Sequence, residues 1–221
     1  MPVIHINNKS FSSIPAFPLK GVHLFPHMFL PLTIFEPRYV ELVDYALETK
    51  KNHLISIATP LEDGLEGEPP QLRPILGAGL IIAKQEVSPK RYNILVRGVT
   101  RILLKEELEQ THLFRQVEAE ILQDEEVNQD ELQLRENELR NLIQVYAQAH
   151  PKSAEDLYLI LNHSTDAEVL SHLLGARIPC PPQEKQRIFE ELNPVKRLAL
   201  IKHHLSTMLL TTTRSDDPCV H

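Results

Sequence analysis

Short apolar runs broken by prolines occupy the first part of the chain and predict irregular or edge strands. They cover residues 14–19 and 28–35, with prolines inside both runs. Because proline cannot donate a ladder hydrogen bond, such runs are typical of sheet edges. From Pro37 apolar residues recur at helical spacing as far as Lys50, which predicts one helix between strands. Residues 53–58 predict the next strand.

Longer strands are expected in the middle of the chain. Residues 75–83 are apolar on both faces, and residues 92–97 alternate apolar and polar side chains after the turn sequence Ser88-Pro89-Lys90. The two runs therefore predict a hairpin. Gly98 stands where a strand has to bend, and residues 113–121 alternate once more. Several short strands with one inserted helix favour a small closed or half-closed barrel.

After Gln123 the apolar positions take up a helical period. Acidic residues within 124–131 precede the first long helix, where the helix dipole favours negative charge. Thr165 and Glu168 predict a capping box for a later helix, which Gly175 is expected to end. Other predicted starts are Ser153, Pro181-Pro182 and Asn193-Pro194.

The change of period predicts two subdomains. Residues 1–123 are expected to form the β-rich part, ordered from about residue 14, and residues 124–211 the helical part. Residues 212–221 are expected to be a frayed tail. Residues 60–74 are rich in proline and acid without periodicity, so they predict a surface loop.

Charge and composition narrow the list of partners. Acidic residues outnumber basic ones by 30 to 23, for a formal net charge of −7, and no basic run exceeds two residues. Nucleic acid is therefore an unfavourable partner. Cys180 and Cys219 are too few for a disulfide framework, and the first residues lack a signal-peptide pattern. No apolar stretch reaches the roughly 20 residues that cross a bilayer, so we expect a soluble cytoplasmic protein without a membrane partner.

The common catalytic motifs are absent from the sequence. There is neither a phosphate-binding Gly-Lys-Ser/Thr tripeptide nor a nucleophile elbow or Ser-x-x-Lys pattern. His23 and His27 have the spacing of metal ligands on a helix, but Pro26 argues against a helix there. Cys180 lies between two prolines with no basic activator and is expected to be inert. We therefore expect no enzymatic activity, no cofactor and no metal site.

A long tract near the N-terminus resembles a known family. Residues 17–19 (FPL) and 24–39 (LFPHMFLPLTIFEPRY) are similar to the N-terminal substrate-recognition domain of Lon proteases. Further similar tracts are residues 77–79, residues 92–101 and the helical ending at 185–198. Together they span about residues 14 to 210, nearly the whole chain.

The resemblance implies an α+β fold, with an N-terminal PUA-like β-barrel that carries one inserted helix and a C-terminal helical bundle. It also implies a stand-alone Lon-domain protein, because the sequence stops where the ATPase module of full-length Lon would begin and holds no serine–lysine protease module. The implied partners are unfolded or damaged polypeptides, together with a protease or chaperone. The resemblance is also compatible with a homo-oligomer.

The candidate binding residues are Phe25, Met28, Phe29 and Leu30. Such side chains suit either a buried strand or an apolar groove for extended peptides, and burial is the commoner outcome. Alternation along the segment would leave one face open. The hypothesis is a non-catalytic module that binds exposed apolar segments, as an adaptor or holdase. The alternative is an RNA-binding module, because PUA-like barrels elsewhere bind RNA.

Overall fold

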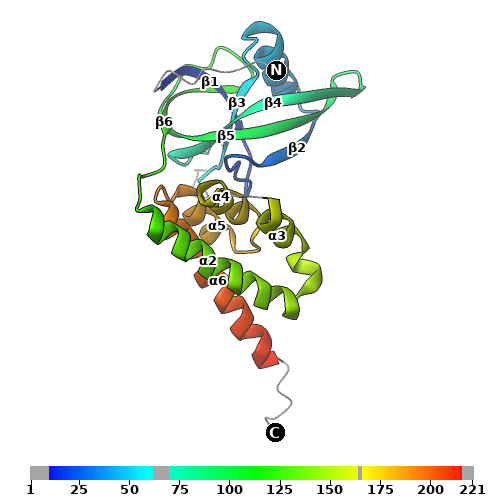
Figure 1. The fold of residues 1–221 in the computed structure, drawn as a ribbon. Coiled ribbons are helices and arrows are strands. Elements are labelled where there is room, and N and C mark those ends of the chain that lie inside the picture. The colour runs from blue at the N-terminus through cyan, green and yellow to red at the C-terminus, as the bar shows by residue number, and fades with distance from the viewer. Residues whose placement is uncertain (1–9, 62–69, 164–165, 216–221) are drawn as a thin grey trace. The chain divides into compact units, whose positions relative to one another are not determined.

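A computed structural model describes residues 10–61, 70–163 and 166–215. The chain forms two compact units, residues 1–123 and 124–221. The first unit holds the strands and helix α1, and the second holds helices α2 to α6 (Figure 1). Most of the predicted loop at 60–74 and the end of the predicted tail lie outside the described residues.

One mixed six-stranded sheet makes up most of the first unit. Its strands are β1 (Ser10–Pro18), β2 (Phe29–Ile34), β3 (Leu54–Ala58), β4 (Ile75–Ser88), β5 (Arg91–Glu107) and β6 (Arg115–Leu122). The order is β2-β5-β4-β3-β1-β6, and β6 also pairs with β5. Only β1 and β3 pair in parallel among the described strands. The sheet therefore curls until β6 meets both β1 and β5, while β2 pairs with β5 alone.

The predicted α+β class is confirmed. The expected barrel is a curled sheet in which β2 lies outside the ring of the other strands. The predicted hairpin joins β4 to β5, and Lys90 at its turn adopts the left-handed region with φ of 60°. β5 runs on through Gly98 as a strand of 17 residues. The bend expected at Gly98 is a slip in the pairing with β4, between Ala78 and Gly79.

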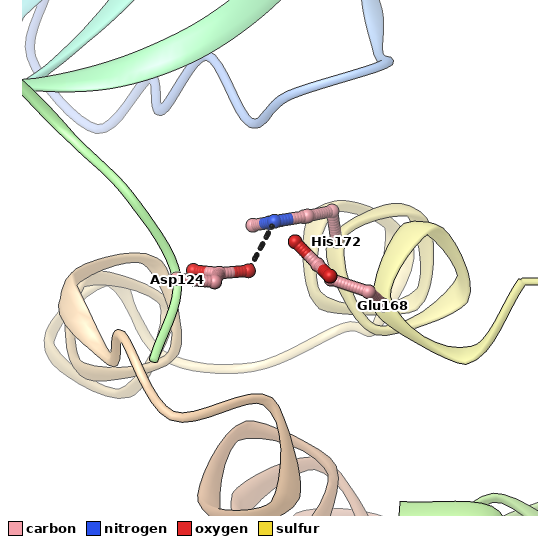
Figure 2. Close-up of side chains that lie close together, drawn as sticks. All are labelled: Asp124, Glu168 and His172. Carbon is pink, nitrogen blue, oxygen red and sulfur yellow. Dashed lines mark hydrogen bonds and ion pairs between the residues drawn. The ribbon is translucent and has the colours of Figure 1, made fainter. Parts of the chain in front are cut away.

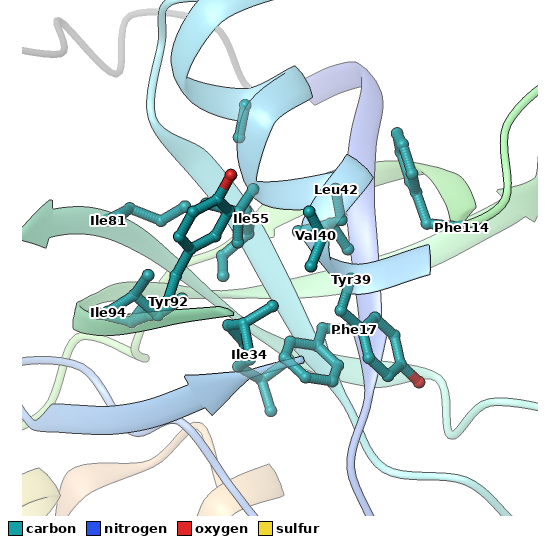
Figure 3. Packing of buried hydrophobic residues seen from close by; sticks show 14 of the residues in the cluster. Phe17, Ile34, Tyr39, Val40, Leu42, Ile55, Ile81, Tyr92, Ile94 and Phe114 are labelled. Atoms are coloured by element: carbon teal, nitrogen blue, oxygen red, sulfur yellow. The ribbon is translucent and has the colours of Figure 1, made fainter. Parts of the chain in front are cut away.

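Helix α1 (Pro37–Asp44) starts at Pro37, as the sequence predicts, and a π-helical turn, η1 (Tyr45–Thr49), follows it. The apolar face of α1 packs on one side of the sheet (Figure 3). There the rings of Phe17 and Tyr39 lie 3.9 Å apart between centroids. Alternate residues of the strands build a second cluster, which includes Ile14, Leu54, Leu76, Ile102 and Val117. Both faces of the central strands are therefore buried.

Small residues let the chain before β2 lie directly on the sheet. A Cβ at Gly77 would stand 2.3 Å from the Leu24 carbonyl oxygen, and one at Gly98 would stand 2.0 Å from that of Phe25. Real Cβ atoms do not approach backbone oxygens so closely, so only glycine fits at these two positions. The sequence predicted a bend at Gly98 without identifying the segment that approaches it.

The second unit consists of five helices among its described residues. They are α2 (Gln129–Ala149), α3 (Pro151–His163), α4 (Ala167–Arg177), α5 (Pro182–Glu190) and α6 (Pro194–Ser215). The Asn193 carboxamide oxygen accepts from the backbone N–H of Lys196 at 3.1 Å, which confirms the predicted cap of α6. Helix α6 continues to Ser215, past the predicted end at residue 211.

Three predicted helix boundaries are wrong. Helix α3 begins at Pro151 and not at Ser153. The N-cap of α4 is Asp166, whose carboxylate accepts from the backbone N–H groups of Glu168 and Val169 at 2.8 and 3.0 Å. Aspartate caps as well as threonine does, and here it lies one residue nearer the helix. Gly175 does not end α4, which continues to Arg177. The Lys185 ammonium donates to the carbonyls of Gly175 and Ala176, so side-chain capping replaces a glycine stop.

Gly98→Ala is expected to lower the free energy of unfolding by about 3 kcal/mol, because the new methyl group would overlap the backbone of Phe25. Gly21→Ala is the control, since a Cβ there meets nothing within 4 Å and only its φ of 72° opposes the change. That strain should cost about 1 kcal/mol. Urea unfolding of both variants measures the difference, and wild-type stability of Gly98→Ala would contradict the packing described here.

Candidate functional site

The structure separates the four predicted binding residues into inward and outward groups. Phe25 is only 1% exposed and is therefore a core residue. Met28 and Leu30 are partly buried against the cluster beneath α1. Phe29 is 51% exposed, because the alternation of β2 turns it to the other face of the sheet. Phe25 must be dropped from the candidate surface, and Phe29 is the member whose ring is offered to solvent.

The turn before β2 fixes this orientation. His27 adopts the left-handed region with φ of 67°, and its N–H donates to the Gly98 carbonyl at 3.0 Å. The Gly98 N–H in turn donates to the Met28 carbonyl at 2.8 Å. These bonds set the register in which Phe29 lies opposite Arg97 of β5. A slip of one residue would bury Phe29 and expose Leu30.

The outward side chains of three neighbouring strands form a continuous surface, here called the β2–β5 face. Its members are Phe29, Pro31 and Thr33 of β2, Asn93, Leu95 and Arg97 of β5, and Ala83 and Gln85 of β4, which lie in register rows. Of these, only Leu95 is partly buried and the others are exposed. The Thr33 hydroxyl donates to the Asn93 carboxamide oxygen at 3.0 Å, and no carboxylate belongs to the face.

The outer edge of β2 is poorly suited to pair with another strand. Because Gly98 and Met28 are hydrogen-bonded partners, the alternation of an antiparallel ladder directs the backbone of Pro31 to the outer edge. Proline has no N–H to offer there. Such a residue protects an edge strand against adding further strands. Contacts to this part of the sheet are therefore expected to use side chains of the β2–β5 face.

A second candidate is a polar cluster in the helical unit, where Asp124, Glu168 and His172 converge (Figure 2). His172 is buried, and its Nε2 lies 3.0 Å from Oδ2 of Asp124. Candidate ligand atoms of the three residues all lie within 4.8 Å of one another. Sequence reasoning treated the acidic residues near 124 only as helix-start charges. The i, i+4 spacing of Glu168 and His172 on α4 was the available signal.

Arg197 of α6 already places a positive charge beside Asp124, where a bound metal ion would otherwise supply it. Its side chain is completely buried and donates to both carboxylate oxygens of Asp124, at 2.6 and 3.0 Å. It also donates to the Ser171 hydroxyl at 2.8 Å and to the Glu191 carbonyl at 2.7 Å. A guanidinium with these partners already compensates the charge of Asp124. We therefore interpret the cluster as a structural ion-pair network between helices, and not as a metal centre.

Cys180 agrees with the expectation of an inert thiol, because burial raises its pKa. One basic group, Lys185, does lie close to the thiol. The Lys185 ammonium is itself committed to backbone carbonyls at the end of α4, and burial lowers its pKa. This pair therefore supports the fold and offers no activated nucleophile.

Comparison with known proteins decides the family. Residues 13–207 match the family model of the ATP-dependent protease La (LON) substrate-binding domain. The chain belongs to this family. It is 24% identical over 199 residues to the Lon protease of Desulfosudis oleivorans and 26% identical over 185 residues to that of Roseiflexus castenholzii. These alignments cover 89% and 84% of the chain but only 24% and 23% of the relatives, so the chain spans about a quarter of their length.

Solved structures show the same fold. The N-terminal domain of the Mycobacterium avium complex Lon protease superposes with a TM-score of 0.70 at 17% identity, covering 88% of this chain and 98% of that one. A Lon N-terminal domain protein from Xanthomonas campestris has a TM-score of 0.59 at 18% identity, covering 86% and 96%. The predicted resemblance is confirmed. Among the described helices, none has the length and apolar character to cross a membrane.

Glu168→Gln is expected to stabilise the protein near neutral pH. Burial, followed by the negative charge of Asp124, raises the pKa of Glu168 above its usual 4.5. The folded state therefore holds this proton more tightly than the unfolded chain, and stability falls as pH rises from about 4.5 through the folded pKa. Glutamine removes that loss, so the variant should melt higher than wild type at about pH 7 and equally at about pH 4.

The control is Glu155→Gln, which alters an exposed glutamate of α3 outside the cluster. Thermal unfolding followed by circular dichroism at both pH values measures the effect. A lower melting temperature for Glu168→Gln at neutral pH would contradict this account of the cluster.

Proposed function

We propose that the chain is a non-catalytic module that binds exposed apolar segments of unfolded polypeptides through the β2–β5 face. The observation that most strongly supports this proposal is the half-exposed ring of Phe29, which points outward from a strand whose inward residues pack against the core. Aromatic side chains presented in this way are frequent binding anchors. Membership of a substrate-binding family supports the same role.

The surroundings of Phe29 support a binding role for the whole face. Pro31 and Leu95 lie in the next register row with Ala83, so an apolar strip continues from the ring across three strands. Phe35, which follows β2, and Ile82, which precedes Ala83 in β4, are exposed at 64% and 46%. Clustered apolar exposure on a soluble surface is a mark of interaction sites. An unfolded chain, which presents apolar side chains without a fixed shape, suits such an open surface.

Catalysis is not part of the proposal. The sequence lacks a phosphate-binding loop and an activated serine, and the matching family model describes a substrate-binding domain. We further propose that the module acts in the cytoplasm as an adaptor or holdase, where bound clients are passed to a protease or chaperone. The Lon relatives support this setting, because the matched domain there belongs to a protease.

Phe29→Ala is expected to weaken capture of a reduced, unfolded model protein by roughly thirtyfold, which corresponds to about 2 kcal/mol for the loss of an aromatic anchor. Its stability should change by no more than about 0.5 kcal/mol, because the half-exposed ring lies outside the core clusters. Capture is measured by titration against the immobilised unfolded protein, and stability by thermal unfolding.

Phe25→Leu is the matched control, since the same residue type is buried four positions earlier. It should lose about 1.5 kcal/mol of stability through altered packing. Below its melting transition it should still capture the client as wild type does. Equal capture by wild type and Phe29→Ala would contradict the assignment of the binding surface.

A further inference from the structure

The positive charge of Arg97, beside Phe29, affects which polypeptide segments the β2–β5 face binds. Arg97 of β5 is the register partner of Phe29, and both side chains are exposed on the β2–β5 face. Directly opposed residues of an antiparallel pair have Cβ atoms about 5 Å apart. The guanidinium of Arg97 can therefore reach a group held against the ring of Phe29.

Arg97 has no acidic partner within the described chain, and the same holds for Arg91 at the start of β5. By contrast, the Lys84 ammonium lies 2.7 Å from Asp44, and that of Lys105 lies 2.8 Å from Glu120. Arg115 pairs with Glu107. In a chain of net charge −7, an unneutralised arginine on a face without carboxylates is a local positive site.

The protected edge of β2 leaves recognition mainly to side chains. Because Pro31 removes a backbone donor from that edge, a bound segment gains little from ladder hydrogen bonds. Apolar contact with Phe29 and charge pairing with Arg97 then remain as the strongest interactions that the row can provide. Their side-by-side placement suits an apolar residue and an acid that are close together in the client.

We infer that the β2–β5 face prefers extended segments in which an aromatic or large aliphatic residue is followed two positions later by aspartate or glutamate. In an extended chain, residues two apart lie on one side at a separation of about 7 Å, which matches the reach of an arginine beside the ring. The inference rests on the proposed function and adds a selectivity to it. The client's apolar residue packs on Phe29, and its carboxylate accepts hydrogen bonds from Arg97.

The test uses two labelled 12-residue peptides with one central phenylalanine, followed two positions later by Asp in one peptide and by Asn in the other. Fluorescence anisotropy of wild type should show about three- to fivefold tighter binding of the Asp peptide, the range of an exposed ion pair. The preference should shrink as salt is raised. Arg97→Gln should remove the preference while keeping the affinity for the Asn peptide.

Arg91→Gln is the matched control, because Arg91 is exposed on the same strand and lies six residues, or about 20 Å, from Arg97. It should keep the preference, whereas an equal loss in both variants would show a general charge effect and overturn the inference. Equal binding of the two peptides by wild type would also overturn it, leaving the proposed function intact.

Two further outcomes separate the inference from the proposed function. Failure of wild type to bind either peptide or an unfolded protein would overturn both. Arg97-dependent binding of a single-stranded RNA, without binding of the Asp peptide, would overturn the inference in favour of a nucleic-acid surface. Circular dichroism of each variant confirms that the fold is retained before binding is compared.

Discussion

The close approach of the chain before β2 to the glycines of β4 and β5 is the constraint on which the first unit depends. Leu24 and Phe25 lie so near Gly77 and Gly98 that a Cβ at either glycine would overlap backbone atoms. This contact anchors the turn at His27, and the turn sets the register of β2 on β5. Register decides which side chains of β2 face the core. The exposure of Phe29 is therefore a consequence of packing at two glycines.

The helical unit depends on a different interaction, the buried pair between Arg197 and Asp124. Removing both charges from water is costly, and the pair survives because nearly every donor of the guanidinium meets an oxygen. Beside this pair, burial and then the negative charge of Asp124 raise the pKa of Glu168. A cluster of side chains that resembles a metal or catalytic site thus serves to join helices.

Periodicity in the sequence predicted most of the elements, because each strand and helix has its own alternation of apolar residues. It also predicted the hairpin at Ser88-Pro89-Lys90 and the cap at Asn193. It could not separate Phe25 from Phe29, since both are phenylalanines in one proline-rich tract. Only the contact with Gly98, far along the chain, buries the first and exposes the second.

Long-range partners account for the rest of what was missed. The network around Arg197 joins residues that are distant in sequence, and local patterns carry no information about them. Likewise, the residue type of Arg97 does not show that it stands opposite Phe29. That pairing follows from the register of β2 on β5, which the turn at His27 establishes.

Site-specific photo-crosslinking tests the central claim most directly. Replacing Phe29 with p-benzoylphenylalanine puts a reactive group on the β2–β5 face, and replacing Tyr158, an aromatic residue of α3 that is 40% exposed, puts it on the helical unit. After irradiation with a reduced, unfolded model protein, we expect an adduct at position 29 and little at position 158. Adducts at position 158 without any at position 29 would contradict the account.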